Sequence, residues 1–339
     1  MELHKIGCPQ CKSYEIKKRF CYETKNNGIR KLYECCCCET VFSETKNTFL
    51  QGLRKPVSLI IMVVRARAEG LAFNAACRTF EISKNTLILW QSRLANLKKT
   101  LFLFALAHEF LKMVIEGDEL YTKVEKNVPP EESRGWTIVL MERASRFIWL
   151  MQCGKKDKKL FKKAIEALCK IIEKTDDITL VTDGERRYGN LLFEICHELV
   201  RTGKRGRPKK TLKKGVKVRI KNKGSQSKKR GKKHPKYQSP VSEHPETVQD
   251  IENKDIHANH IEGQNAALRR RNSAYRRRTN TYAKTDSGLQ MTLDIQWIIH
   301  NFVKKHFTTK EIPAVALGII DKGLSLLHVF KIPSVAFNQ

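Results

Sequence analysis

The chain has 339 residues, of which 65 are Lys or Arg and 35 are Asp or Glu, so its formal net charge is +30 and its pI is about 9.8. The hydrophobic share of 41% is ordinary for a folded protein, and the length allows two or three domains. A basic field of this strength favours a polyanion as partner over a surface that is basic without a role.

The sequence also bears on secretion, membrane insertion and the state of the cysteines. The N-terminus lacks the apolar core of a secretory signal. Residues 101–115 and 312–330 are apolar, but charges interrupt both, and neither gives about 18 uninterrupted apolar residues. An anionic membrane surface is therefore only a weak alternative partner. Seven of the 11 cysteines precede residue 40, which points to a reducing compartment and metal binding rather than to disulfides.

Residues 1–47 are expected to form a zinc ribbon. Cys8 and Cys11 make one C-x2-C pair, and Cys35 and Cys38 make a second. A tetrahedral zinc needs two such pairs brought together by a hairpin, and an Asn-Asn-Gly sequence between them predicts the turn. A domain this small buries little apolar surface, so the metal would supply its stability. Three further cysteines leave the exact ligand register open: Cys21, Cys36 and Cys37.

Residues 51–98 are expected to form a helix-turn-helix DNA-binding domain. Helices are predicted over 57–68, 72–80 and 84–97, with Ser83 as the N-cap of the third. A connecting helix is predicted to follow over 98–111. That third helix would enter the major groove of DNA. A plain three-helix bundle gives the same spacing and stays open as the alternative. The side chains expected to reach DNA are Lys84, Asn85, Thr86 and Gln91.

Residues 110–290 are expected to form an α/β catalytic domain with a mixed sheet covered by helices. Asp118 and Asp183 would lie at the ends of two strands. Neighbouring strands, as in a ribonuclease-H-like sheet, would bring these two carboxylates within a few ångströms. The predicted strands are 113–121, 136–141, 147–153 and 178–181, and the predicted helices are 157–174 and 187–200, followed by helices over 287–305 and 312–330.

Residues 201–242 contain no acidic residue and are rich in Lys and Arg. Arg205-Gly206-Arg207-Pro208 matches the core of an AT-hook, whose arginines lie in the narrow minor groove of A·T-rich DNA. Apolar and basic residues alternate over 216–221, which predicts one more strand with a basic outer face. We expect a DNA-binding insertion, with a solvated loop as the alternative.

Glu262 precedes a helical run that is dense in arginine. Carboxylates from separate elements can hold two divalent cations about 3.5–4 Å apart for in-line displacement at a phosphodiester, and oxygen ligands suit Mg²⁺ or Mn²⁺. Arginine in place of lysine suits bidentate phosphate contacts. His257 and His260 are expected to orient a carboxylate or a phosphate rather than to bind a second metal. The expected catalytic set is Asp118, Asp183 and Glu262, with ordinary surface acids as the alternative.

The Glu262 block resembles that of the transposases of the insertion-sequence-one family, which are DDE transposases. Glu262, Asn265, Leu268 and Arg269 give E-x2-N-x2-L-R, and Arg277-Arg278-Thr279 continues it at a recognisable spacing. Three further groups resemble other blocks of the family: Asp118-Glu119 with Trp136, Thr182-Asp183-Gly184 with Tyr188, and Tyr33, Cys35, Cys38 and Phe42 in the second zinc knuckle.

The resemblance implies a ribonuclease-H-like catalytic domain behind a zinc ribbon and a helix-turn-helix. It implies two Mg²⁺ or Mn²⁺ ions, a structural Zn²⁺, and double-stranded DNA as partner, both as terminal inverted repeats and as target. The ends would be cut by hydrolysis, and the freed 3′-hydroxyls would be joined to target DNA by transesterification. The DNA contacts implied in this block are Asn265, Arg269, Arg277 and Arg278.

The same resemblance implies a homo-oligomer on DNA and a cytoplasmic, nucleoid-associated location in a prokaryotic cell. Two features depart from the family: a longer separation between Asp183 and Glu262, and a C-terminal helical segment over 291–339. Two other functions stay open. One is a non-enzymatic, sequence-specific DNA-binding regulator, and the other is a related metal-dependent nuclease that cuts without joining.

Overall fold

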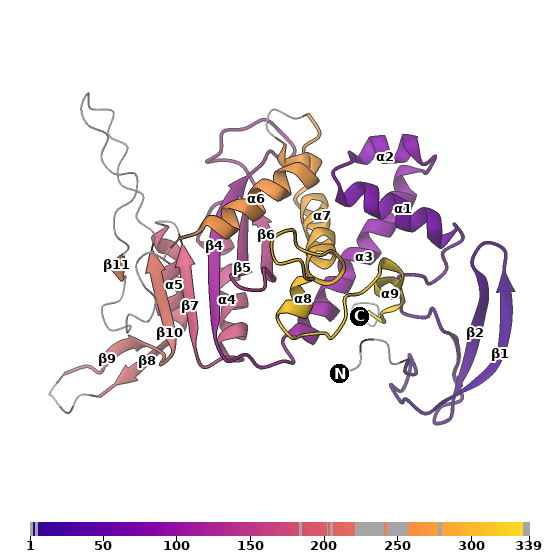
Figure 1. Cartoon of the computed structure of the whole chain (residues 1–339), viewed down its shortest axis with the longest axis horizontal. Helices are drawn as coiled ribbons and strands as arrows, with labels where there is room; N and C mark the ends of the chain where they lie inside the picture. The colour runs from indigo at the N-terminus through magenta and orange to yellow at the C-terminus, as the bar shows by residue number, and fades with distance from the viewer. Residues whose placement is uncertain are drawn as a thin grey trace. The chain divides into compact units, whose positions relative to one another are not determined.

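The computed structural model describes residues 3, 6–182, 185–201, 203, 206–220, 241–242, 257–276 and 280–334. They form a mixed α/β fold in two compact units, whose elements are labelled in Figure 1. The first unit comprises residues 1–107, 270–281 and 290–339, and the second comprises 108–269 and 282–289. Several residues singled out in the sequence lie outside the described ones: Asp183, Arg205, Arg277 and Arg278.

The first unit begins with a three-stranded antiparallel sheet of β1 (Ile16–Thr24), β2 (Gly28–Cys35) and β3 (Val41–Ser43). The predicted hairpin is confirmed, because Thr24 pairs with Gly28 across the Asn-Asn-Gly turn. Gly28 has a φ of +66°, a conformation that glycine adopts without steric cost. The same turn also contacts the start of the first helix, because Asn27 Oδ1 accepts a 2.9 Å hydrogen bond from the Val57 amide.

Three helices follow: α1 (Val57–Ala68), α2 (Phe73–Thr79) and α3 (Lys84–Ala105). The predicted cap of α3 is confirmed, because Ser83 Oγ accepts a 3.1 Å hydrogen bond from the Thr86 amide. The third helix and the connecting helix predicted over 98–111 form one continuous helix that ends at Ala105. Its buried face includes Leu87, Trp90, Leu94, Leu97, Leu101 and Phe104.

The C-terminal segment belongs to the first unit. From residue 290 on, it contains the larger part of α7 (Asp286–Ile298), which passes into a π-helical turn, Ile299–Val303. The single helix predicted over 312–330 is wrong, because the segment forms two short helices, α8 (Pro313–Ala316) and α9 (Leu326–Lys331). Gly318, with a φ of +76°, lies between them. Aromatic rings seat this segment in the unit's core, with Trp297 6.4 Å from Phe102 and Phe330 4.2 Å from Phe49 between ring centroids.

The second unit is built on a six-stranded mixed sheet in the order β11-β10-β7-β4-β5-β6. β4, β5 and β6 pair antiparallel in sequence order, whereas β7 pairs parallel with β4 on its other side and β10 pairs parallel with β7. The predicted mixed sheet is therefore confirmed. The strands are β4 (Met113–Tyr121), β5 (Trp136–Glu142), β6 (Ile148–Gly154), β7 (Ile178–Thr182), β10 (Val216–Ile220) and β11 (Val241–Ser242).

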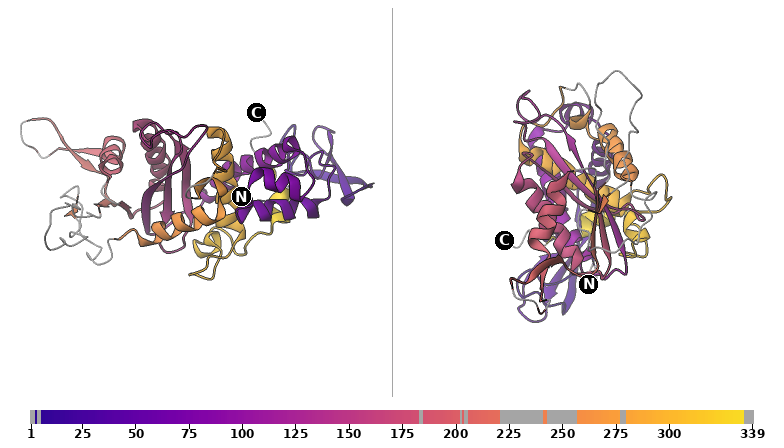
Figure 2. Two further views of the ribbon diagram at one scale, coloured as in Figure 1. Left: turned by 90° about the horizontal axis from the view of Figure 1, so that it is seen from above. Right: turned by 90° about the vertical axis from the view of Figure 1, so that its left-hand side faces the viewer.

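Helices cover both faces of this sheet (Figure 2). α4 (Lys158–Ile172) and α5 (Arg186–Ile195) lie on one face, and α6 (Asn259–Arg271) crosses the other. The helix predicted over 187–200 is wrong in its last part. There the chain turns into β8 (His197–Val200), which pairs with β9 (Lys209–Leu212) in a separate two-stranded sheet.

The basic tract contributes to this sheet, because the strand predicted over 216–221 is β10. The predicted basic outer face is wrong. Arg219 is only 2% exposed, and its Nη1 donates a 3.1 Å hydrogen bond to Val218 O. Lys217 is also withdrawn from solvent and binds Asp177 Oδ1 at 2.9 Å. The middle of the tract therefore completes the fold instead of forming a separate insertion.

Candidate functional sites

The N-terminal unit contains a four-cysteine cluster. The Sγ atoms of Cys8, Cys11, Cys35 and Cys38 all lie within 4.8 Å of one another. Cys8 Sγ is 3.4 Å from Cys38 Sγ, and Cys11 Sγ is 3.4 Å from Cys35 Sγ. Sulfurs about 3.8 Å apart are expected around a tetrahedral zinc with Zn–S bonds of about 2.3 Å. The cluster therefore could hold a structural zinc, with one C-x2-C pair from each side.

The two pairs lie on matching turns. The Cys8 amide donates to Ser13 O at 2.8 Å, and the Lys12 amide donates to Cys8 O at 3.1 Å. The second turn repeats both bonds around Cys35, at 3.0 Å each, with Thr40 and Glu39 in the equivalent positions. This repetition answers the question of register that the sequence left open. The remaining cysteines of the region, Cys21, Cys36 and Cys37, are exposed and outside the cluster.

The surroundings of the cluster favour thiolate at one ligand. The Cys38 Sγ is 3.2 Å from the Thr40 hydroxyl. Hydrogen bonds from this hydroxyl and from the Thr40 amide lower the pKa of the Cys38 thiol to about 6. Because thiolate is the form that binds a metal, a zinc ion bound here would take these side chains in their deprotonated form.

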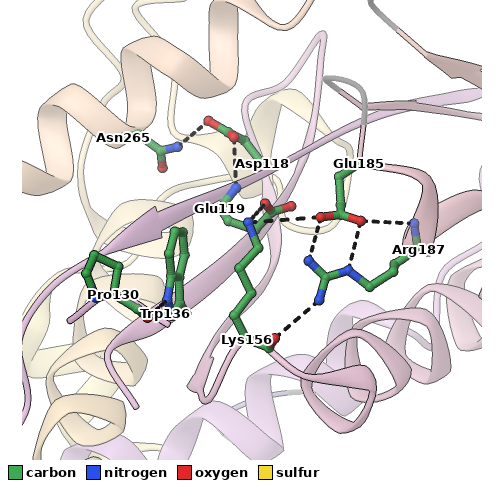
Figure 3. A network of polar contacts seen from close by, with 8 residues as sticks. All are labelled: Asp118, Glu119, Pro130, Trp136, Lys156, Glu185, Arg187 and Asn265. Atoms are coloured by element: carbon green, nitrogen blue, oxygen red, sulfur yellow. Dashed lines mark hydrogen bonds and ion pairs between the residues drawn. The ribbon is translucent and has the colours of Figure 1, made fainter. Parts of the chain in front are cut away.

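Asp118 lies on β4, where it pairs with Val139 of β5. The expectation that it ends a strand is wrong, because β4 continues for three residues past it to Tyr121. Its side chain is half-buried and held at both oxygens. Oδ1 accepts from the Glu119 amide at 2.8 Å, and Oδ2 accepts from Asn265 Nδ2 at 2.8 Å (Figure 3).

Asn265 is the residue of α6 that meets Asp118. It was predicted to contact DNA, but it is only 2% exposed and lies against the carboxylate instead. Its Oδ1 is buried and has no hydrogen-bond partner within the part of the chain that the structure describes. Asn265 therefore has one acceptor oxygen near Asp118 that the described residues leave unsatisfied.

The other two expected metal ligands, Asp183 and Glu262, both lie between Asp118 and Asn265 in the sequence. Glu262 is exposed and lies three residues before Asn265 on α6, a spacing that puts both on neighbouring positions of the helix surface. Thr182, the last residue of β7, pairs with Gly117, the residue before Asp118. Asp183 follows Thr182 directly in the sequence but lies outside the described residues.

Behind Asp118, the opposite face of β4 carries a charged network that the sequence did not predict (Figure 3). Glu119, 7% exposed at its side chain, binds Lys156 Nζ at 3.0 Å, and Lys156 also lies 4.0 Å from Glu185 and 4.3 Å from the centre of the Trp136 ring. Arg187 closes the network with a 2.6 Å bond to Glu185. The side chains of this network come from β4, β5, the loop before α4 and the start of α5. No single local sequence motif therefore predicts it.

Glu116, His257 and His260 form a second group of side chains with metal-binding atoms within 4.8 Å of one another. A cation fits poorly here. Burial, Arg146, His257 and Arg143 together lower the pKa of His260 to about 4. The guanidinium groups of Arg146 and Arg143, which make smaller contributions to this shift than burial does, also repel a divalent cation. Both oxygens of Glu116 are also occupied by N–H donors.

The expected DNA contacts are placed unevenly. Lys84 and Asn85 are exposed on the first turn of α3, as predicted for a surface that meets DNA. Gln91 is buried at 8% exposure, so it is not available. Two apolar side chains on the same helix are exposed and were missed, Ile88 at 47% and Leu89 at 45%. Of the remaining arginines, Arg207 is exposed and Arg269 is half-buried.

Neither a scan against models of protein families nor a search of curated proteins gives a match for this chain. Among the described residues, no helix has the length and apolar character needed to cross a membrane.

Proposed function

We propose that this protein is a DDE transposase of the kind found in the insertion-sequence-one family. It would bind the terminal inverted repeats of a mobile element, cut the element ends and join them to target DNA. One observation carries this proposal. The 2.8 Å hydrogen bond between Asn265 and Asp118 brings the helix that bears Glu262 against the strand that bears Asp118, across 147 residues of sequence.

The topology of the sheet supports a ribonuclease-H-like interpretation. β4, β5 and β6 form an antiparallel meander, and β7 and β10 add in parallel on the other side of β4. The proposed acidic residues occupy β4, the position after β7, and the helix after the last strands. This is the arrangement that the family resemblance implies, with the basic tract accommodated around β10.

In this proposal Asp118, Asp183 and Glu262 hold two divalent cations, and their carboxylate oxygens suit Mg²⁺ or Mn²⁺. When bound, such ions activate an attacking oxygen and stabilise the leaving oxygen of an in-line displacement. The other residues of the site would position the carboxylates and the DNA. Asn265 fixes the orientation of the Asp118 carboxylate, and Arg269, one turn further along α6, would contact a phosphate.

The first unit fits a DNA-binding role in the same proposal. α2 and α3, joined by a short turn, would act as a helix-turn-helix with Lys84 and Asn85 on the groove-facing turn. The four-cysteine cluster, with structural Zn²⁺, would hold the ribbon that precedes it. The net charge of +30 supports tight, salt-sensitive binding to DNA. Joining two element ends further implies at least two protomers on the DNA.

The test is a cleavage and strand-transfer assay with Mg²⁺, duplexes that carry the element's terminal repeats, and a plasmid target. Asp118→Asn and Glu262→Gln proteins are expected to lose activity by on the order of 10²–10³-fold or more, the cost typical of removing an electrostatic group from an active site. Glu166→Gln is the matched control, because Glu166 is an exposed carboxylate on α4 at the opposite face of the sheet.

Three outcomes separate the candidate functions. Cleavage followed by joining supports a transposase. Cleavage without joining, abolished by the same substitutions, would indicate the related nuclease. Tight DNA binding with no metal-dependent cleavage would contradict the proposal and favour a DNA-binding regulator. Full activity in the Asp118→Asn protein would contradict the assignment of Asp118 to the catalytic set.

A further inference from the structure

We propose that Glu116 is a positioning residue that holds α6, and Glu262 with it, against β4. The inference rests on the proposed function for its catalytic meaning, but its geometry is independent of that function. Glu116 lies two residues before Asp118 on β4, so the two side chains project from the same face of the sheet. Glu116 is fully buried, with 0% exposure.

Both oxygens of Glu116 accept hydrogen bonds, one from α6 itself and the other from an arginine that also binds the segment just before α6. Oε2 accepts a 2.9 Å hydrogen bond from the Ile261 amide in the first turn of α6. Oε1 accepts a 2.7 Å hydrogen bond from Arg143 Nε, and Arg143 Nη2 donates in turn to His257 O at 2.6 Å. The Glu116 carboxylate thus binds the first turn of α6 at Ile261, and the Arg143 guanidinium binds the chain just before the helix at His257.

The chemistry of these contacts explains why a carboxylate is needed. The first amides of a helix have no partner within the helix, and its N-terminus favours negative charge. Glu116 meets both needs at Ile261, the residue directly before Glu262. Arg143 compensates the buried charge of Glu116, and its planar fork reaches two acceptors that a lysine could not bridge in the same way.

A buried carboxylate on the next strand shows what a purely structural role looks like. Glu142 of β5 is 4% exposed and accepts from the Ser145 amide at 2.6 Å and from the Ala144 amide at 2.9 Å. It stabilises the turn between β5 and β6 and contacts no part of α6 in these bonds. Glu116 and Glu142 are therefore both buried glutamates, but Glu116 binds α6 whereas Glu142 binds the turn between β5 and β6.

The test compares Glu116→Gln with Glu142→Gln in the full-length protein. The side-chain amide that Glu116→Gln introduces would face an N–H donor, which loosens α6 without changing the size of the side chain. We expect the Mg²⁺ concentration for half-maximal cleavage to rise about 10–100-fold in the Glu116→Gln protein, the range typical when the support of a metal ligand is removed. In the Glu142→Gln protein the Mg²⁺ dependence should stay that of the wild type.

A second readout does not depend on activity. Hydrogen exchange of the Ile261 amide should accelerate at least about tenfold in Glu116→Gln and remain unchanged in Glu142→Gln, because only Glu116 accepts from that amide. If Glu116→Gln does not fold, Arg143→Lys serves in its place. It keeps the positive charge and removes the fork, so the same two shifts are expected with smaller size.

Wild-type Mg²⁺ dependence together with wild-type Ile261 protection in Glu116→Gln would overturn the proposal. Zinc content gives a further route to rejection. The contrary result would be a second zinc ion in the wild-type protein that the Glu116→Gln and His260→Ala proteins lose. Such a result would show that Glu116, His257 and His260 form a metal site, and that Glu116 does not act by holding α6. If the wild-type protein shows no metal-dependent activity, the proposed function fails, whereas the exchange of the Ile261 amide still decides whether Glu116 holds α6.

Discussion

The four-cysteine cluster and the carboxylate site bring their side chains together in opposite ways. The cluster joins two short turns separated by 30 residues, Cys8 to Cys38, and each turn has the same pair of backbone hydrogen bonds. The carboxylate site joins Asp118 to Asn265 across 147 residues, and its parts depend on the order of strands in a sheet. One is encoded locally, the other by the tertiary fold.

This difference predicts how each region responds to loss of metal or of one side chain. Little apolar core surrounds the cysteines, where the buried cluster consists of Cys8, Cys35 and Phe42. A metal bound there would supply much of the local folding free energy. The proposed carboxylate site lies on a sheet with helices on both faces, so this sheet should keep its fold when divalent cations are removed.

The largest effect is expected at the cluster. Cys8→Ser should remove zinc binding, which is worth about 10 kcal/mol or more in apparent free energy at comparable sites, and residues 16–43 should lose their amide protection. Zinc content and hydrogen exchange of the full chain measure this. Cys36→Ser is the control, since Cys36 is exposed and outside the cluster. Equal zinc content in the two variant proteins would refute the assignment of the ligands.

A smaller loss of stability is expected behind the carboxylate site. Lys156→Met leaves the buried Glu119 carboxylate without its cation, and breaking a buried pair in this way costs about 3 kcal/mol or more. Lys158→Met removes a partner from an exposed pair with Glu194 and should cost less than about 1 kcal/mol. Denaturant unfolding followed by hydrogen exchange of the sheet amides compares them. Similar losses would mean that the network contributes no more than surface charge.

Asn265→Asp should alter the site with a modest effect on stability. It replaces the donor to Asp118 by a second carboxylate, so the free energy of unfolding should fall by about 1–3 kcal/mol as a buried bond is lost. Repulsion between the carboxylates should also change the metal dependence of cleavage. Ala266→Asp adds the same charge at an exposed position one residue away and is expected to behave as the wild type. An Asn265→Asp protein with unchanged Mg²⁺ dependence would remove Asn265 from the site.

The smallest effect is expected at α3, which, like the cysteine cluster, follows from local sequence patterns. Lys84→Ala should weaken DNA binding and reduce the slope of log affinity against log salt concentration by about 1, as for one lost phosphate contact. Lys99→Ala changes an exposed lysine in the second half of the same helix and should leave the slope unchanged. Fluorescence anisotropy at several salt concentrations measures both. A reversed order would place the DNA on the other end of α3.

Local chemistry made much of the fold predictable from sequence. The hairpin turn, the Ser83 cap and the full extent of β4 follow from short-range patterns, and the structure has all three. Prediction failed where tertiary context decides. The helix expected over 187–200 ends at Ile195 because the chain pairs as β8 with a strand of the basic tract. Arg219 is buried on β10, although the alternation of apolar and basic residues predicts that it faces solvent.

The candidate site was predictable in part for the same reason. Carboxylates that precede helices or follow strands can be selected from sequence, and the cysteine pairs can be selected by spacing. The burial of Asn265 and the grip of Glu116 on the Ile261 amide could not be selected, because each depends on α6 lying across β4. Glu116 reads in sequence as one of several acids near Asp118, and only its partners set it apart.

The central claim is that Asp118, Asp183 and Glu262 share one divalent-cation site, and oxidative cleavage of the protein by bound Fe²⁺ tests it most directly. Fe²⁺ that replaces Mg²⁺ generates radicals which cut the backbone beside its ligands. We predict cuts near residues 118, 183 and 262 that excess Mg²⁺ suppresses and that Glu262→Gln weakens at all three positions. Cuts at only one of these positions, or cuts that Mg²⁺ does not suppress, would contradict a shared site.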